Sequence, residues 1–343
     1  MAHASARQAP SNSNGARLAI ALGDPAGIGA EVTLKALARD PHQQEGPSPL
    51  LVGCRRWLEA SYAALRQRSN EPLRDPASLE MVDLPLPGAI RTGVGTAACG
   101  AASFAWLSAA VELVLRGDCQ ALVTAPIAKA SWHAAGHHYP GQTERLAELC
   151  GSPSASMLFT ARSPSTPWRL NTLLATTHIP LETVAATLTP ALITAKLDVL
   201  RRFCRRFSEH PRLVVAGLNP HAGEGGVLGR QERDWLQDCL RDWQARHDDV
   251  RVVGPLPPDT CWLDAAAAWQ GGPPAADGYL ALYHDQGLIP VKLLAFDAAV
   301  NTTLGLPFLR TSPDHGTGFA IAGQGIARAT SMSAALDTAR ELG

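Results

Sequence analysis

Three histidines that lie far apart in the chain each follow an apolar run that predicts a buried strand. They are His178, His221 and His284. In an open α/β sheet, ligands bind outside the carboxyl ends of the strands. Three imidazoles delivered there can share one divalent cation and leave coordination positions open for a substrate. The simpler alternative is that each is an ordinary histidine at a strand end.

A second group of polar residues follows His284 and predicts an anion site. Lys292 and Arg310 lie in otherwise apolar stretches, and Asn301 adds a neutral hydrogen-bonding group between them. A cation in a cleft needs an anion, and arginine binds phosphate or carboxylate through two parallel hydrogen bonds. The set therefore favours a small phosphorylated substrate over three separately solvated side chains.

Two glycine-rich turns connect predicted strands to helices. The turn at 219–226 places Asn219 and Glu224 beside His221, and its glycines let the backbone approach a ligand closely. We interpret this turn as functional. The turn at 23–29, Gly-Asp-Pro-Ala-Gly-Ile-Gly, lacks the Gly-x-Gly-x-x-Gly spacing of a dinucleotide-binding loop. An ordinary tight turn explains it as well as a ligand loop does.

Apolar runs alternate with amphipathic segments along most of the chain. This alternation is typical of mostly parallel sheets and of the α/β class. The 343 residues exceed the length at which one core stops growing, so we expect two lobes. No low-complexity linker separates them, which favours intertwined boundaries. The predicted strands are 18–22, 50–53, 79–82, 121–124, 156–159, 170–177, 213–218, 251–253 and 279–283.

Composition excludes several classes of function. The net charge is −1 and no basic block stands out, which disfavours nucleic-acid binding. No apolar run reaches the roughly 18 residues of a membrane span, so we expect no membrane insertion. The seven cysteines are scattered without a Cys-x-x-Cys pair, which favours a reduced, cytoplasmic interior. Residues 1–16 are rich in Ala, Ser and Asn, and we expect a flexible tail there.

Seven blocks between residues 18 and 328 are highly specific. They are Gly-Asp-Pro-Ala-Gly-Ile-Gly at 23–29, Leu-Val-Thr-Ala-Pro-Ile-Ala-Lys at 122–129, Thr-Thr-His-Ile-Pro-Leu at 176–181, Gly-Leu-Asn-Pro-His-Ala-Gly-Glu at 217–224, Gly-Pro-Leu-Pro-Pro-Asp-Thr at 254–260, Tyr-His-Asp-Gln-Gly-Leu at 283–288 and Asn-Thr-Thr-Leu-Gly-Leu-Pro-Phe-Leu-Arg-Thr-Ser at 301–312. In this order, they resemble the 4-hydroxythreonine-4-phosphate dehydrogenase family.

The resemblance implies a fold and an assembly. The fold is α/β, with two α/β/α lobes around a central cleft, similar to isocitrate and isopropylmalate dehydrogenases. The first lobe would comprise residues 17–140 and about 290–343. The second, about 141–289, would carry much of a homodimer interface, with active sites shared between the two subunits.

The resemblance also assigns roles to residues of the predicted site. His178, His221 and His284 match metal ligands, with His284 supplied by the partner subunit; zinc, magnesium and cobalt are the candidate metals. Gln142, Thr143, Lys292, Asn301 and Arg310 match substrate-binding positions. Asn219, Glu224, Asp259 and Asp285 are candidates for outer contacts to the metal or for a cofactor loop.

The implied reaction is NAD- or NADP-dependent oxidation of 4-phosphooxy-L-threonine, in pyridoxal 5′-phosphate biosynthesis. The metal would act as a Lewis acid on the substrate hydroxyl, and hydride would pass to the nicotinamide. The product, 2-amino-3-oxo-4-phosphooxybutanoate, would lose CO2 to give 3-amino-2-oxopropyl phosphate. Lys292 and a metal-bound hydroxide are both candidates for the general base.

One position departs from the family, and two other functions stay open. The family usually has His where this chain has Gln142; we expect this amide to point into the cleft and to hydrogen-bond the substrate phosphate. Lys292 and Arg310 suit a carboxylate as well as a phosphate, so a relative that oxidises an aromatic cis-dihydrodiol dicarboxylate is one alternative. A non-catalytic metabolite-binding protein is the other.

Overall fold

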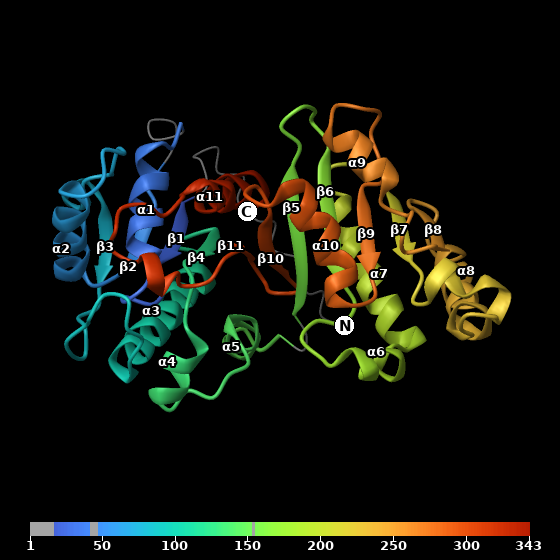
Figure 1. The fold of residues 1–343 in the computed structure, drawn as a ribbon, viewed down its shortest axis with the longest axis horizontal. Coiled ribbons are helices and arrows are strands. Elements are labelled where there is room, and N and C mark those ends of the chain that lie inside the picture. The colour runs from blue at the N-terminus through green and yellow to red at the C-terminus, as the bar shows by residue number, and fades with distance from the viewer. Residues whose placement is uncertain (1–16, 42–46, 153–154) are drawn as a thin grey trace, which may run out of the picture.

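One continuous sheet of eleven strands runs through the whole molecule. The computed structural model describes residues 17–41, 47–152 and 155–343, so the tail predicted at 1–16 lies outside the described residues. The strand order is β3-β2-β1-β4-β11-β10-β5-β6-β9-β7-β8. Helices cover this sheet on both sides (Figure 1), which confirms the α/β class. The strands are β1 (Leu18–Ala21), β2 (Leu50–Gly53), β3 (Glu80–Asp83), β4 (Ala121–Thr124), β5 (Ser156–Arg162), β6 (Arg169–Leu174), β7 (Arg212–Ala216), β8 (Arg251–Leu256), β9 (Gly278–Ala281), β10 (Val300–Leu304) and β11 (Leu309–Pro313).

The sheet contains two parallel groups that run in opposite directions. β3, β2, β1, β4 and β11 are mutually parallel, and so are β6, β9, β7 and β8. Three antiparallel pairings in the middle, β11 with β10, β10 with β5 and β5 with β6, reverse the direction. Each of the three predicted metal ligands follows one of the strands β6, β9 and β7 in the chain. These strands are neighbours in the sheet and parallel, so their carboxyl ends lie at one edge.

The helices bury their apolar faces on this sheet. Gly278 of β9 faces Leu200 and Cys204 of α7, whereas Ala281 faces α10 at Gly287. Because residues alternate faces along a strand, α7 and α10 cover opposite faces of β9. The helices are α1 (Gly29–Ala38), α2 (Arg55–Arg66), α3 (Ala97–Leu115), α4 (Lys129–Ala134), α5 (Gln142–Leu149), α6 (Leu181–Thr187), α7 (Pro190–Cys204), α8 (Gln237–Gln244), α9 (Leu263–Trp269), α10 (His284–Ala295) and α11 (Thr330–Leu342).

Two central strands were not expected from the sequence. We interpreted Asn301 and Arg310 as ligand-binding residues and predicted no strand around them, but both lie in the hairpin β10–β11, in which Thr302, Thr303 and Arg310 are buried. Polar residues hide the alternation that normally indicates a strand. His284 also differs from the prediction: it opens α10 instead of closing a strand.

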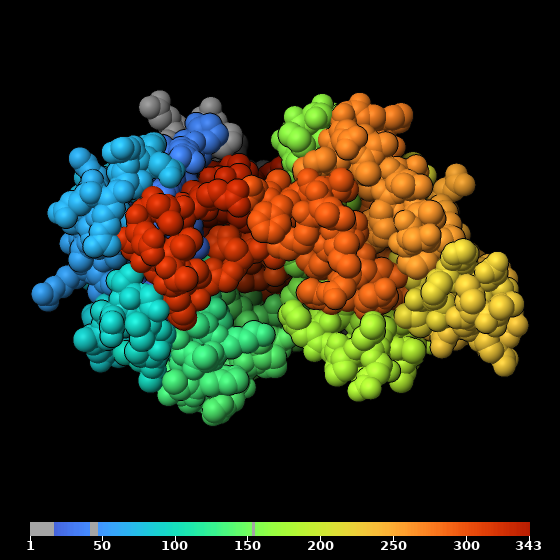
Figure 2. Space-filling model, in the orientation of Figure 1, coloured from blue at the N-terminus to red at the C-terminus, as the bar shows by residue number. Residues whose placement is uncertain are grey.

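The last part of the chain returns to the first half of the molecule. β11 pairs with β4, and α11 packs on β11, β4 and α1. Figure 2 shows this segment, coloured orange to red, crossing the middle of the molecule between its two halves. The predicted lobe boundary near residue 290 falls inside α10, which packs on β6 and β9. The division into two lobes stays a prediction.

Helix α3 is long and apolar enough to cross a membrane by length and composition alone. The sequence analysis expected no such segment, because Ser and Glu residues interrupt the apolar run of α3. In the structure α3 packs against β1, β2, β4 and α4, and 56% of the hydrophobic window is buried. Core helices of folded proteins have the same composition, so we interpret α3 as a core helix.

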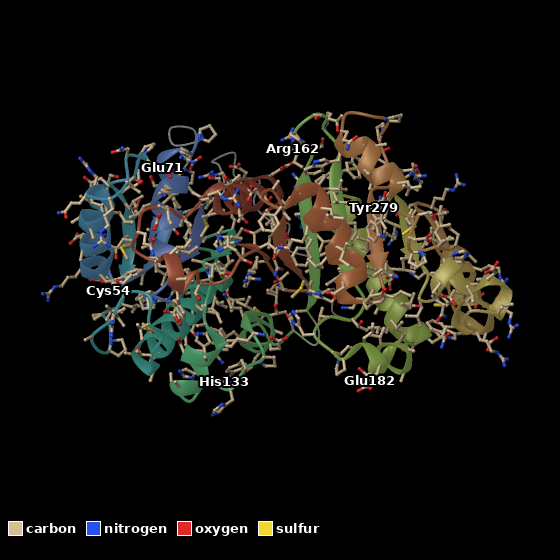
Figure 3. All side chains as sticks on the ribbon, viewed as in Figure 1. Cys54, Glu71, His133, Arg162, Glu182 and Tyr279 are labelled. Carbon is tan, nitrogen blue, oxygen red and sulfur yellow. The ribbon has the colours of Figure 1, made fainter. Side chains whose placement is uncertain are left out.

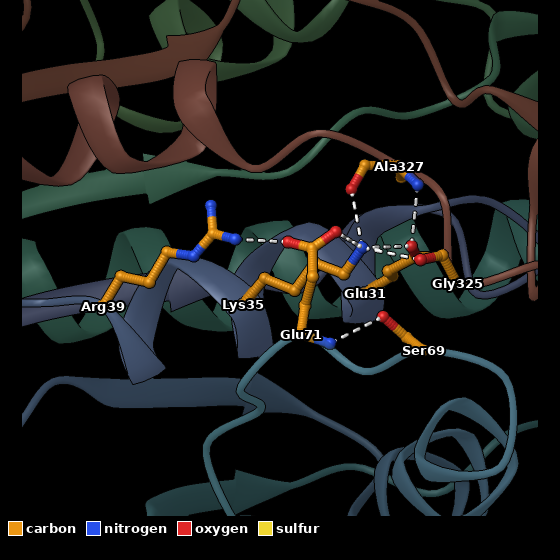
Figure 4. Close-up of polar contacts among 7 residues, drawn as sticks. All are labelled: Glu31, Lys35, Arg39, Ser69, Glu71, Gly325 and Ala327. Atoms are coloured by element: carbon orange, nitrogen blue, oxygen red, sulfur yellow. Dashed lines mark hydrogen bonds and ion pairs between the residues drawn. The ribbon is translucent and has the colours of Figure 1, made fainter.

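A buried charge cluster joins α1 to the segment between β11 and α11 (Figure 4). Lys35 Nζ lies 2.9 Å from Glu31 Oε1 and donates to the carbonyls of Gly325 and Ala327, both at 2.9 Å. Glu71, labelled in Figure 3 as well, contacts the same ammonium at 3.0 Å. The side chains of Lys35 and Glu31 are 0% and 2% exposed. The cluster therefore fixes residues 325–327 against α1 from inside.

We predict that Lys35→Met lowers the free energy of unfolding by about 3–5 kcal/mol, because Glu31 keeps a buried charge without its cation. The matched control is Arg39→Met, which removes an exposed partner of the same Glu71 and should cost less than about 1 kcal/mol. Urea unfolding of both variants measures the difference. Equal losses would show that the buried contacts of Lys35 carry no special stability.

Candidate functional site

Two adjoining cavities lie beside the middle strands of the sheet. Each has a volume of about 420 Å³, and both are lined by Met157, His178, Asn301 and Asp314. The first also contains Arg310, and the second contains His284. Cavities of this size suit small metabolites. Predicted residues that line at least one cavity are Gln142, Thr143, His178, His284, Asp285, Lys292, Asn301 and Arg310.

Arg310 is a fully buried cation without a carboxylate partner in the described part of the chain. Its Nε and one terminal nitrogen donate to Thr124 Oγ1 at 3.0 and 2.6 Å, and the other terminal nitrogen donates to Thr303 Oγ1 at 3.2 Å. Burial lowers the pKa of Arg310 to about 10, so it remains charged at neutral pH. A buried charge without a counter-charge is unfavourable. The arrangement therefore favours binding of an anion in the first cavity.

Gln142 lines the cavity as expected, but its amide makes contacts within the protein. Its Oε1 accepts a hydrogen bond from Arg310 at 3.1 Å, and its Nε2 donates to the carbonyl of Ala125 at 3.3 Å. Gln142 and Thr143 open α5, next to the cavity. The amide thus orients Arg310, a role that the sequence analysis did not anticipate; a direct phosphate contact stays a prediction.

His178 and His284 of the same chain lie side by side. Their ring centroids are 5.3 Å apart, and Nδ1 of His284 contacts Asp285 Oδ1 at 2.8 Å. Burial, followed by the charges of Lys129 and His284, lowers the pKa of His178, which favours its neutral form. This chain's own His284 thus adjoins His178, and the expectation that the partner subunit supplies His284 stays a prediction.

This histidine pair fits a shared metal ion. Two imidazoles that bind one tetrahedral Zn²⁺ through bonds of about 2.1 Å have ring centroids about 5 Å apart. The contact with Asp285 leaves Nε2 of His284 available and matches the carboxylate–histidine pairs that orient metal ligands. Nevertheless, the described residues contain no group of three His, Cys, Asp or Glu side chains that could hold a metal. The third predicted ligand, His221, lines neither cavity.

His221 lies on an exposed turn, away from the pair. Its side chain is 65% exposed, and Glu224 is its neighbour at 3.8 Å. Asn219 is not free for a ligand, since its Nδ2 donates to Gln231 and Glu232 at 2.8 Å. Asp259 is exposed and lines neither cavity. Of the four candidates for outer contacts, the structure brings only Asp285 to the histidine pair.

Lys292 connects the two sides of the second cavity. It belongs to α10, and its Nζ pairs with the carboxylate of Asp314, which directly follows β11; it also donates to the Asp314 carbonyl at 3.2 Å. Burial raises the pKa of Asp314 despite the neighbouring ammonium. Asn301 Oδ1 is buried and has no hydrogen-bond partner within the described ranges. A bound ligand with a donor group would satisfy it.

The sequence analysis gave no role to Thr124 or Asp314. Both line the first cavity, together with Lys129, for which a substrate contact was a weak expectation. The available signal for Asp314 was its closeness in sequence to Arg310, because the strand that it follows, β11, was not predicted. Nothing in the sequence pairs Thr124 with Arg310, because the contact depends on β4 and β11 being neighbours.

The sheet is covered by helices on both faces, and one cleft beside it contains a buried cation and a pair of imidazoles. This combination indicates an enzyme that acts on small anionic metabolites. The family described as "Pyridoxal phosphate biosynthetic protein PdxA" matches residues 45–339. This chain belongs to that family.

Close relatives and a solved structure agree with this membership. The chain is 66% identical over 330 residues to 4-hydroxythreonine-4-phosphate dehydrogenase of Synechococcus sp. (strain RCC307), covering 95% of this chain and 99% of the relative. It is 40% identical to D-threonate 4-phosphate dehydrogenase of Salmonella typhimurium, with 95% and 98% covered. The crystal structure of 4-hydroxythreonine-4-phosphate dehydrogenase from Klebsiella pneumoniae is 36% identical, with a TM-score of 0.81 and 96% and 99% covered.

We predict that Gln142→Glu removes anion binding by supplying Arg310 with an internal counter-charge. Inorganic phosphate should raise the melting temperature of the wild type, because a ligand of the folded state stabilises it. Gln142→Glu should melt at a higher temperature without phosphate and show no further rise. The matched control, Gln142→Ala, should keep the rise but need about fivefold more phosphate, the equivalent of one neutral hydrogen bond. A normal phosphate response in Gln142→Glu would show that Arg310 does not bind the anion.

Proposed function

We propose that this chain oxidises 4-phosphooxy-L-threonine with NAD or NADP, in pyridoxal 5′-phosphate biosynthesis. The product would be 2-amino-3-oxo-4-phosphooxybutanoate, which decarboxylates to 3-amino-2-oxopropyl phosphate. The observation that carries the proposal is the buried, carboxylate-free Arg310 in a cavity that adjoins the histidine pair. The names of the cyanobacterial relatives at 52–66% identity support the same substrate. The seven unpaired cysteines favour a cytoplasmic location.

Each cavity residue has a role in this reaction. Arg310, oriented by Thr124 and Gln142, attracts the phosphate with its charge and donates to it the N–H of Nη1 that Thr303 does not occupy. Asn301 Oδ1 accepts a hydrogen bond from the substrate's amino or hydroxyl group. Lys292 Nζ takes the hydroxyl proton as its own proton passes to Asp314, whose raised pKa suits a group that holds a proton.

His178 and His284 would hold the divalent metal, His284 through Nε2 because its Nδ1 contacts Asp285, and the imidazole donors favour zinc or cobalt over magnesium. When bound, the metal supplies Lewis-acid stabilisation to the substrate oxygen. The protein positions the substrate carbon against the nicotinamide and excludes water, while the cofactor supplies the redox chemistry.

We further propose that the enzyme is a homodimer in which His221 reaches the site of a second copy. The turn that carries His221 also exposes Val227 and Leu228, at 82% and 46%. Helix α10 exposes Ile289 and Leu293 on one face, and Ile289 lines the second cavity. Large exposed apolar patches mark interaction sites. A second copy that covers these exposed apolar residues would also lie next to His178 and His284.

The proposed activity is tested by reduced nicotinamide formation from 4-phosphooxy-L-threonine, with and without a chelator. We expect turnover that the chelator abolishes and that zinc or cobalt restores. 4-Hydroxy-L-threonine is the matched control, and it should react far more slowly because Arg310 has no phosphate to bind. Faster turnover of D-threonate 4-phosphate or of an aromatic cis-dihydrodiol dicarboxylate would replace the substrate. Tight substrate binding with no turnover would indicate a non-catalytic binding protein.

Mixed dimers test which subunit supplies each histidine. Chains with His178→Ala and His221→Ala should each be inactive, but their mixture should regain about a quarter of the wild-type activity. Random mixing makes half of the dimers mixed, and each mixed dimer has one intact site. Mixing His178→Ala with His284→Ala should restore nothing, since both residues serve the same site. If only the mixture of His178→Ala and His284→Ala regains activity, the partner subunit supplies His284. If neither mixture regains activity, the sites are not shared between subunits.

A further inference from the structure

The turn that carries His221 has an unusual backbone. Six consecutive residues, 221–226, have positive φ angles. Three of them are not glycine: His221 (53°), Ala222 (52°) and Glu224 (43°). Non-glycine residues rarely adopt this region and never form runs there without support. Something outside the turn must therefore hold it.

Glu232 supplies that support from the far side of the turn. Its Oε1 accepts from the backbone N–H groups of Leu218 and Asn219, both at 2.7 Å, and its Oε2 accepts from Asn219 Nδ2 at 2.8 Å. The residue is 1% exposed, and no Lys or Arg of the described ranges forms an ion pair with it. Hydrogen bonds from backbone and amide N–H groups to a carboxylate are short and strong. All three donors belong to the two residues that enter the turn.

The residues around the contact between Glu232 and Asn219 are packed closely against it. A Cβ at Gly229 would lie 2.1 Å from Cγ of Asn219, and one at Gly223 would lie 2.8 Å from Oε2 of Glu232. Arg233 donates to the carbonyl of Gly225 at 3.2 Å. Glu232 also begins a π-helical turn, Glu232–Leu236, a geometry that is frequent at functional sites.

We propose that Glu232 is a positioning residue for the reaction, which holds the left-handed turn so that His221 can enter the site of a second copy. This proposal rests on the shared site proposed above. The side chain of His221 is 65% exposed, so burial of this side chain does not hold the turn. Strained backbone persists where the surrounding structure enforces it, and it concentrates at functional sites. Glu232 acts through geometry and touches neither substrate nor metal.

Glu232→Ala should loosen the turn and impair catalysis through His221. Hydrogen exchange of residues 217–228 should accelerate at least tenfold, while exchange in β1 and β4 stays unchanged. The turnover number should fall at least tenfold in the metal-loaded dimer. Glu232→Gln keeps an oxygen for the two backbone donors and should restore most of both properties. If Glu232→Gln is as inactive as Glu232→Ala but exchanges normally, the carboxylate has a chemical role and the proposal is wrong.

Mixed dimers separate positioning from a general loss of structure. Glu232→Ala mixed with His178→Ala should regain activity, because the intact turn of the second chain serves the intact histidine pair of the first. Glu232→Ala mixed with His221→Ala should regain none. The opposite pattern would place Glu232 in its own chain's site and overturn the proposal, as would wild-type exchange in Glu232→Ala. If the wild type fails to oxidise 4-phosphooxy-L-threonine, the proposed function fails, while hydrogen exchange still decides whether Glu232 holds the turn.

Discussion

A buried cation without a carboxylate partner among the residues that the structure describes is the constraint on which the site depends. Arg310 is held by hydroxyl and amide oxygens from β4, β10 and α5, and none of these groups neutralises it. Such a residue is tolerated only where the surrounding fold is stable enough to absorb its cost. The continuous sheet supplies that stability, because β11 lies between β4 and β10 and cannot move independently of either half.

The opposed strand directions explain how the rest of the site assembles around this cation. β6, β9 and β7 run against the strands of the first half, so the residues that follow β6 and β9 adjoin the strand carrying Arg310. His178 and His284 thereby reach the same cleft from neighbouring connections. His221 follows the next strand, and its left-handed turn directs it to the exposed surface. The single chain thus brings a buried cation and two imidazoles together, and the proposed homodimer would supply the third imidazole from its second copy.

Local patterns predicted nine of the eleven strands of the described residues and missed the two central strands β10 and β11. The strands 50–53 and 121–124 have the predicted bounds, because uniformly apolar runs between turns are distinctive. β10 and β11 were not predicted because Asn301 and Arg310 line the cavity and Thr302 is a buried polar residue, so the usual apolar alternation is absent. The cavity residues were found by their chemical types and by family resemblance. Their partners were not, since Thr124 and Asp314 matter only through contacts between elements distant in sequence. The left-handed turn was interpreted as functional from its glycines, but its support by Glu232 depends on three-dimensional contacts.

The position of β11 also bears on how the chain can fold during synthesis. β4 emerges from the ribosome long before β11, yet its free edge is covered only when β11 and α11 have been made. The first half therefore cannot close its sheet as an independent unit, and domain-by-domain folding from the N-terminus is incomplete here. Until the last segment arrives, the edge of β4 presents unpaired backbone groups that can pair with other chains. Truncated or stalled chains of this protein should therefore aggregate more readily than the complete chain.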